Sequence, residues 1–137
     1  MTLSELSQLY YLQREIEADR QRLADMRAKA QSVSASKITG MPRSGSHGGL
    51  DAAAVAIADL DLLIQEKLAR CLTEQYRLEE YIASIPDSLT RQIFVLRFVK
   101  GYSWQKVAWG VGGYNTEDSV KKTCYRYIRA EEKKSEA

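Results

Sequence analysis

The stretch VKGYSWQKVAW, residues 99–109, decides how the C-terminal third of this 137-residue chain folds. Gly101 follows an apolar helical pattern, and glycine adopts the left-handed conformation that ends a helix at little cost. Ser103 comes directly after Tyr102, and its side-chain oxygen can cap a new helix. The stretch therefore predicts a tight corner between two helices.

Outward from this corner, the pattern predicts three short helices within residues 86–132. The first covers residues 89–100, the second starts at Ser103 and ends before Gly110, and the third covers residues 117–132 with Asn115 or Thr116 as its cap. The expected inward residues are Ile93, Leu96, Val99 and Phe94 or Phe98, then Trp104, Val107 and Ala108, then Val120, Cys124, Tyr127 and Ile128. Trp104 and Trp109 are expected to be core or packing residues, with base-stacking platforms as the alternative.

A small alanine in the second helix, a glycine-containing turn and a basic third helix are typical of a helix-turn-helix, whose last helix enters the major groove of DNA. The charge distribution favours an anionic partner. Residues 88–130 hold 8 Lys/Arg against Glu117 and Asp118, a net of +6, whereas residues 1–85 hold 10 Lys/Arg against 12 Asp/Glu, a net of −2. The alternative is that these cations are only the solvated face of an amphipathic helix.

Residues 1–85 have the pattern of a coiled-coil-like arm. One helix is expected from Leu3 to about Gln31, interrupted on its apolar face by Asp19, and another from about Asp51 to Ser84. In the second helix, apolar residues recur every seven positions at Ile57, Ile64, Cys71, Leu78 and Ile85, joined by Leu60, Leu68 and Ile82. Such stripes must pack on another helix, so we expect a hairpin within the chain that also forms a homodimer.

The segments that connect these helices are rich in helix-breaking residues. A Gly- and Ser-rich loop is expected at about residues 32–50, and Pro86 is expected to separate the arm from the head, residues 86–132, with Asp87 or Ser88 capping the next helix. Residues 133–137 are expected to be a disordered tail. The fold class predicted is therefore all-α, with a long helical hairpin followed by a trihelical head.

The sequence argues against several classes of protein. No apolar run approaches the ~18 residues of a membrane span, and no secretory signal is present, so a cytoplasmic protein is expected. Cys71 and Cys124 lie far apart inside helical patterns, which favours reduced core cysteines. His47 has no second metal ligand nearby. No phosphate-binding loop or catalytic set is visible, so we expect neither enzymatic activity nor a cofactor.

The segment RQIFVLRFVKGYSWQKVAWGVGGYNTEDSVKKTCYRYI, residues 91–128, resembles region 4 of bacterial sigma factors, in which an LR-x-x-x-G-x-S motif, an apolar-Ala pair and a T/S-V-K/R segment mark three helices. With the helical arm and the block KITGMPRSG, residues 37–45, nearly the whole chain resembles phage-encoded transcription regulators of the RinA and ArpU type. The turn GVGGYNTED is longer and more glycine-rich than in the sigma pattern. The resemblance implies control of phage or prophage late genes in the cytoplasm of a bacterial host.

The sigma-like alignment implies that Glu117, Asp118 and Lys122 read base edges at the start of the recognition helix. Arg91 and Lys100 are further cations near helix ends that could contact the DNA backbone. The phosphate-contact candidates are Ser119, Lys121, Tyr125, Arg126, Arg129 and Lys106.

The expected partner is double-stranded DNA, bound by a dimer that forms through residues 1–85. Two alternatives remain open at this stage. The head could instead bind RNA polymerase or another protein, as sigma-like folds also do, or the chain could be a small subunit of a phage DNA-packaging machine. Salt dependence discriminates between them, because DNA affinity falls steeply with salt and an apolar protein interface is much less sensitive.

Overall fold

The structure, a computed structural model, is all-α and describes residues 1–37 and 47–137. The side chains of residues 33–37, 47, 48 and 50 also lie outside the description. The predictions for the block Lys37–Gly45 and for the His47 side chain therefore fall outside the described residues. Two compact units divide the chain: residues 1–12 together with 71–137, and residues 13–70.

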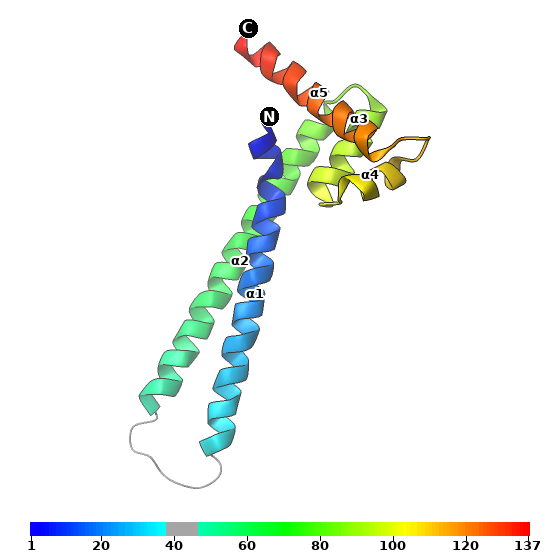
Figure 1. The fold of residues 1–137 in the computed structure, drawn as a ribbon. Coiled ribbons are helices and arrows are strands. Elements are labelled where there is room, and N and C mark those ends of the chain that lie inside the picture. Colours follow the sequence, from blue (N-terminus) through cyan, green and yellow to red (C-terminus); the bar gives the residue numbers. More distant parts are fainter. Residues whose placement is uncertain (38–46) are drawn as a thin grey trace. The chain divides into compact units, whose positions relative to one another are not determined.

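Two long helices, α1 (Leu3–Lys37) and α2 (His47–Ala83), contact each other as a hairpin (Figure 1). This confirms the hairpin expected from the apolar stripes. Both helices are longer than expected, because α1 continues past Gln31 and α2 begins before Asp51. The predicted loop at residues 32–50 is therefore helical at both of its ends.

The unit of residues 13–70 is held by a narrow apolar seam. Ile16 and Leu23 of α1 are buried, as are Leu60 and Ile64 of α2, in agreement with the predicted stripes. Leu68, which was expected in the same stripe, is 39% exposed and lies at its edge. The interruption at Asp19 is explained by an ion pair that Asp19 forms with Lys67 across the seam.

The unit of residues 1–12 and 71–137 has one continuous core. This core joins the start of α1 and the end of α2 to the head. Buried together are Leu6 and Leu9 of α1, Leu78 and Ile82 of α2, Ile85, and the inward residues Ile93, Phe94, Phe98, Val107, Ala108, Val120, Cys124 and Ile128. This organisation differs from the expected division at Pro86, because residues 1–12 and 71–85 belong to the core of the head.

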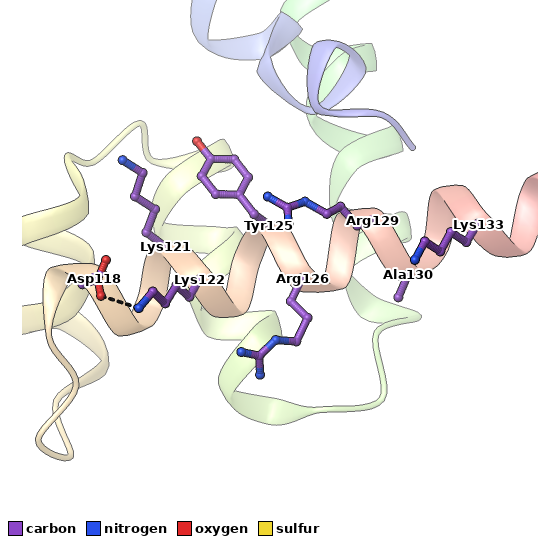
Figure 2. Close-up of a pocket in the computed structure, with 8 residues that line it drawn as sticks. All are labelled: Asp118, Lys121, Lys122, Tyr125, Arg126, Arg129, Ala130 and Lys133. Carbon is purple, nitrogen blue, oxygen red and sulfur yellow. Dashed lines mark ion pairs between the residues drawn. The ribbon is translucent and has the colours of Figure 1, made fainter.

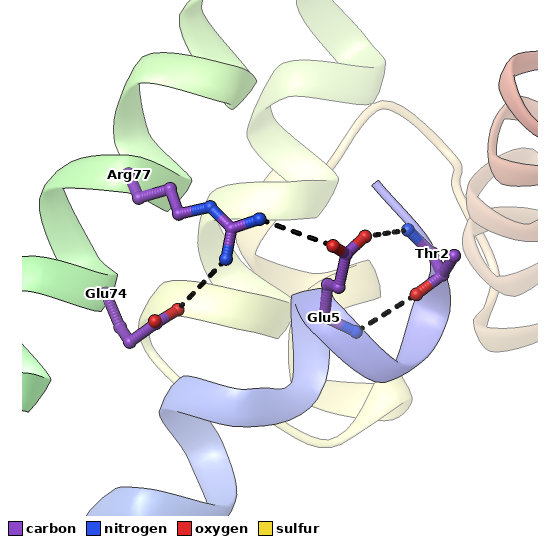
Figure 3. A network of polar contacts seen from close by, with 4 residues as sticks. All are labelled: Thr2, Glu5, Glu74 and Arg77. Carbon is purple, nitrogen blue, oxygen red and sulfur yellow. Dashed lines mark hydrogen bonds and ion pairs between the residues drawn. The ribbon is translucent and has the colours of Figure 1, made fainter. Parts of the chain in front are cut away.

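Polar contacts fix the start of α1 within this unit (Figure 3). The Glu5 carboxylate accepts the backbone N–H of Thr2 at 2.8 Å, and the Glu5 N–H donates to the Thr2 hydroxyl at 3.2 Å, which is a capping box. Arg77 of α2 reaches the same carboxylate at 3.3 Å and Glu74 at 3.8 Å. The Thr2 N–H, with help from Arg77, lowers the pKa of Glu5 below its usual value.

The first head helix is interrupted where the sequence predicted it to be regular. It consists of α3 (Ser88–Phe94), capped by Asp87, followed by a π-helical turn, η1 (Val95–Val99). The π turn shifts the register so that Phe94 and Phe98 are buried, with ring centres 5.2 Å apart. Leu96 and Val99, which were expected to be buried, are only partly so.

The predicted corner at Gly101 and Ser103 is confirmed. Gly101 has a φ of 71°, and the Ser103 side chain accepts the Lys106 N–H at the start of α4 (Trp104–Val111). Helix α4 does not stop before Gly110 as expected but continues to Val111. A Cβ on Gly110 would lie 2.7 Å from the Leu96 side chain, so the close approach of α4 to η1 favours glycine there.

The last helix, α5 (Glu117–Glu136), packs with α3 and α4 to complete the head (Figure 1). Its buried residues are Val120, Cys124 and Ile128, as predicted, whereas Tyr127 is partly exposed. The helix continues through residues 133–136, which were expected to be disordered. Charged residues dominate this last turn, and helical continuation satisfies their backbone N–H groups without any apolar pattern.

Candidate nucleic-acid interface

Helix α5 starts at a well-defined point because its first turn is capped from both directions. The Thr116 side chain accepts the Ser119 N–H at 3.1 Å, and the Ser119 hydroxyl accepts the Thr116 N–H at 2.9 Å. Glu117 and Asp118 occupy the first turn, where negative charge is favourable to the helix dipole. The direction of the outer face of α5 is therefore set by local hydrogen bonds as well as by the core beneath it.

The outer face of α5 forms a shallow groove of about 500 Å³ (Figure 2). It gathers six of the nine site residues named from the sequence, and it adds Ala130 and Lys133, which the sequence reasoning missed. The residues that line it are Asp118, Lys121, Lys122, Tyr125, Arg126, Arg129, Ala130 and Lys133. Five of these eight carry positive charge and one carries negative charge, so an anion meets a net positive surface along more than four helical turns.

The single carboxylate in the groove is matched by a cation of the same helix. Asp118 and Lys122 form an ion pair at 2.9 Å, with side chains 72% and 68% exposed. An exposed pair of this kind stabilises a protein little, because water screens it. Both groups can therefore exchange this contact for one with a ligand at small cost.

Tyr125 is held on this face by a stack that links three elements of the head. Its ring meets the Trp104 ring of α4 edge to face, with centres 5.8 Å apart. The Arg97 guanidinium of η1 lies 4.4 Å from the centre of the Trp104 ring and donates to the Tyr102 carbonyl at 2.9 Å. No role was predicted for Arg97, since nothing in a helical pattern indicates that an arginine will stack on a tryptophan ring.

The other three predicted site residues lie outside the groove. Glu117 is exposed on the first turn of α5, and the Ser119 hydroxyl is occupied by the capping contacts with Thr116. The Lys106 ammonium lies 4.0 Å from the centre of the Tyr102 ring, on the outer side of α4. These positions do not extend the groove, although Lys106 adds positive charge to the head.

Two further cations differ in their surroundings. Arg91, a candidate backbone contact, donates to the carbonyls of Ile85 at 2.7 Å and Pro86 at 2.9 Å. Its guanidinium therefore satisfies orphan carbonyls beyond the end of α2, which is a structural role. Lys100 is exposed at the end of η1.

The predictions for the two tryptophans have different outcomes. Trp104 packs against the core as expected, but Trp109 is 76% exposed, so the expectation that it packs inside the head is wrong. Trp109 lies four residues after Gln105 and three after Lys106, on the same outer side of α4, whereas Val107 and Ala108 fill the inner side.

Several other features bear on the chemistry of the chain. Both cysteines are free thiols, with Cys124 buried and Cys71 partly exposed. The described residues contain no cluster of three or more His, Cys, Asp or Glu side chains placed to hold a metal ion. No helix within residues 1–37 or 47–137 combines the length and apolar character that crossing a membrane requires.

Comparison of the chain with protein-family models, with curated proteins and with solved structures gave no match.

Proposed function

We propose that this protein is a sequence-specific DNA-binding transcription regulator that places α5 in the major groove. The observation that carries the proposal is the groove on α5, where Lys121, Lys122, Arg126, Arg129 and Lys133 lie on one face of a capped helix. A cationic helix of this kind suits the phosphates that border the major groove. The polar groups at its N-terminal end suit base edges, because a carboxylate accepts from cytosine and lysine donates to guanine.

The resemblance to RinA- and ArpU-type regulators adds the biological setting to this proposal, namely phage or prophage late genes in a bacterial host. Dimerisation through the arm is part of it. On α2, Val55 and Leu62 are seven residues apart and are exposed. A second copy could cover this stripe, because heptad spacing keeps apolar residues on one side of a helix. Leu62→Glu should then lower the molar mass measured by sedimentation equilibrium without loss of helicity.

The test of DNA recognition is selection of bound sequences from random duplex DNA by the purified full-length protein, repeated at two salt concentrations. We expect one enriched motif and an affinity that falls as salt rises. If neither salt yields enrichment or measurable binding, the proposal is wrong, and binding to RNA polymerase becomes the function to test next.

A pair of matched variants locates the binding surface. Lys122→Ala with Arg126→Ala removes two positive charges from the groove, and Arg27→Ala with Lys29→Ala removes two from exposed positions on α1. The groove variant should bind the selected sequence about 10- to 100-fold more weakly, since each charged contact contributes about 1 kcal/mol or more. The α1 variant should bind like the unmodified protein. Equal losses in the two variants would show only a dependence on net charge.

A further inference from the structure

The C-terminal part of α4 and the turn between α4 and α5 each carry one aromatic side chain that the fold does not use. Trp109 is 76% exposed and Tyr114 is 106% exposed, the two highest values among the large hydrophobic side chains that the structure describes. Aromatic side chains normally stabilise a protein by being buried, and these two leave most of their apolar surface in water. A role in the core therefore does not account for either residue.

Tyr114 is presented by a turn that several hydrogen bonds close. The Gly112 N–H donates to the Ala108 carbonyl at 3.1 Å, and the Gly112 carbonyl accepts both the backbone N–H of Asn115 at 3.2 Å and its side-chain amide at 2.7 Å. Gly112, Gly113 and Tyr114 all have positive φ, the last at 64°. Tyrosine is unfavourable in this conformation and glycine is not, so the fold alone would favour a third glycine at position 114.

The position of the turn points to a ligand class. Tyr114 lies two residues before Thr116, the cap of α5, and the N-terminal end of a recognition helix is the end that approaches base edges. Trp109 lies one turn after Lys106 on the exposed side of α4. The nearby carboxylates are Glu117 and Asp118, of which Asp118 is already paired with Lys122, and residues 88–130 are strongly positive in sum. Exposed aromatic rings among cations suit nucleic acid, which offers apolar sugar and base faces beside phosphates.

We propose that Trp109 and Tyr114 form a second, uncharged contact to duplex DNA, beside the groove that α5 enters. Their rings pack against deoxyribose edges or thymine methyl groups at the border of the site. This inference rests on the proposed DNA-binding function and adds an apolar anchor to it. Tryptophan and tyrosine have only two side-chain torsions each, so little conformational entropy is lost when their rings dock.

The experiment measures affinity for the selected duplex as a function of salt, using the full-length protein. The variants are Tyr114→Gly, which suits the positive φ and so keeps the turn, and Trp109→Ala, which changes an exposed site in α4. Each is expected to weaken binding about five- to thirty-fold and to leave the slope of log affinity against log salt unchanged, because no phosphate contact is lost. Tyr11→Ala, at an exposed aromatic residue of α1, is the control and should not alter the affinity.

Fluorescence gives a readout that does not depend on affinity. Saturating DNA should quench tryptophan emission, and Trp109→Phe should remove most of that change because the other tryptophan, Trp104, is packed in the head.

The outcomes separate this inference from the proposed function. If both aromatic variants bind like the unmodified protein while Lys122→Ala with Arg126→Ala binds weakly, the aromatic contact is refuted and the DNA-binding proposal stands. If the aromatic variants keep DNA affinity but lose binding to purified RNA polymerase, the turn is a protein-docking surface and the inference is wrong. If the unmodified protein binds no duplex, both proposals fail together.

Discussion

The guanidinium carbon of Arg97 lies 4.4 Å from the centre of the Trp104 ring, and the same ring meets Tyr125 edge to face. These residues belong to η1, α4 and α5, so one stack connects three elements of the head. Tyr125 is also part of the cationic groove. The contact between Trp104 and Tyr125 therefore helps to hold one residue of the groove in place.

Replacing Arg97 by alanine should destabilise the head. The change removes both the stacking on Trp104 and the hydrogen bond to the Tyr102 carbonyl. Together these are worth about 1–3 kcal/mol of the free energy of unfolding. Urea unfolding followed by circular dichroism measures the loss. Arg97→Lys is the control, because it keeps the charge but not the planar group, and it should recover only part of the stability.

Gly101→Ala should lower the free energy of unfolding by about 1–2 kcal/mol, since the residue has a φ of 71°. The new Cβ would also lie 3.2 Å from the Tyr10 ring, which would have to shift. Gly49→Ala provides the contrast, because a Cβ there meets nothing within 4 Å and the residue is part of α2. That variant should be as stable as the unmodified protein or more so. Equal effects at the two glycines would contradict the proposed role of the corner.

Tyr81→Phe should stabilise the protein by about 1 kcal/mol. The Tyr81 hydroxyl is buried and has no hydrogen-bond partner among the described residues. Removing it takes away the cost of desolvating a polar group and leaves the packing of the ring unchanged. Chemical denaturation of the two proteins measures the difference. Tyr11→Phe, at a side chain that is 63% exposed, should have no effect. A loss of stability in Tyr81→Phe would mean that the hydroxyl has a partner in solution.

The parts of the structure that the sequence predicted correctly are those controlled by neighbours in the chain. Gly101 ends a helix and Ser103 starts one because each acts on backbone groups within a few residues. The heptad pattern likewise predicted the buried positions Ile64 and Leu78, because a regular helix places such residues on one side. Ile85 is buried as predicted, although it lies beyond the end of α2.

The parts that were missed depend on packing between distant segments. The π turn at Val95–Val99 inserts one residue into the helical register so that Phe94 and Phe98 both reach the core, and no local pattern indicates it. Trp109 was expected to be buried because of its type, yet it lies on the side of α4 that faces away from Val107 and Ala108. Six candidate site residues do share one groove, because they were chosen from one face of a helix that is regular.

The ion pair between Asp19 and Lys67 crosses the apolar seam of residues 13–70. The Lys67 ammonium lies 2.5 Å from Asp19 and 2.9 Å from Glu15, and the side chains of Lys67 and Asp19 are only 14% and 16% exposed. The hydrogen bonds that the Lys67 ammonium donates to Asp19 and then to Glu15 raise the pKa of Lys67 above its usual value. A polar pair in such a seam is favourable only in one register of the two helices, so it acts against slipped pairings.

Lys67→Leu alone should lower the Tm, because it leaves the Asp19 carboxylate in the seam without its cation. Asp19→Leu with Lys67→Leu should restore the Tm to that of the unmodified protein or exceed it, since two leucines pack well in an apolar stripe. Thermal unfolding followed by circular dichroism distinguishes the variants. If the double variant is less stable than Lys67→Leu, the ion pair itself stabilises the fold and does more than select the register of the two helices.

The stability of the head should fall in alkaline solution because of Cys124. Burial raises the pKa of this thiol from about 9 to about 12. The folded protein then keeps a proton that the unfolded chain releases, so the stability due to this group is complete below about pH 9 and is lost as the pH rises toward 12. Tyr81 titrates in the same range, since burial raises its pKa to about 12, so the measurement uses the Tyr81→Phe background. Chemical denaturation across this pH range should show a decline that Cys124→Ala reduces. An unchanged decline in Cys124→Ala would show that other groups cause it.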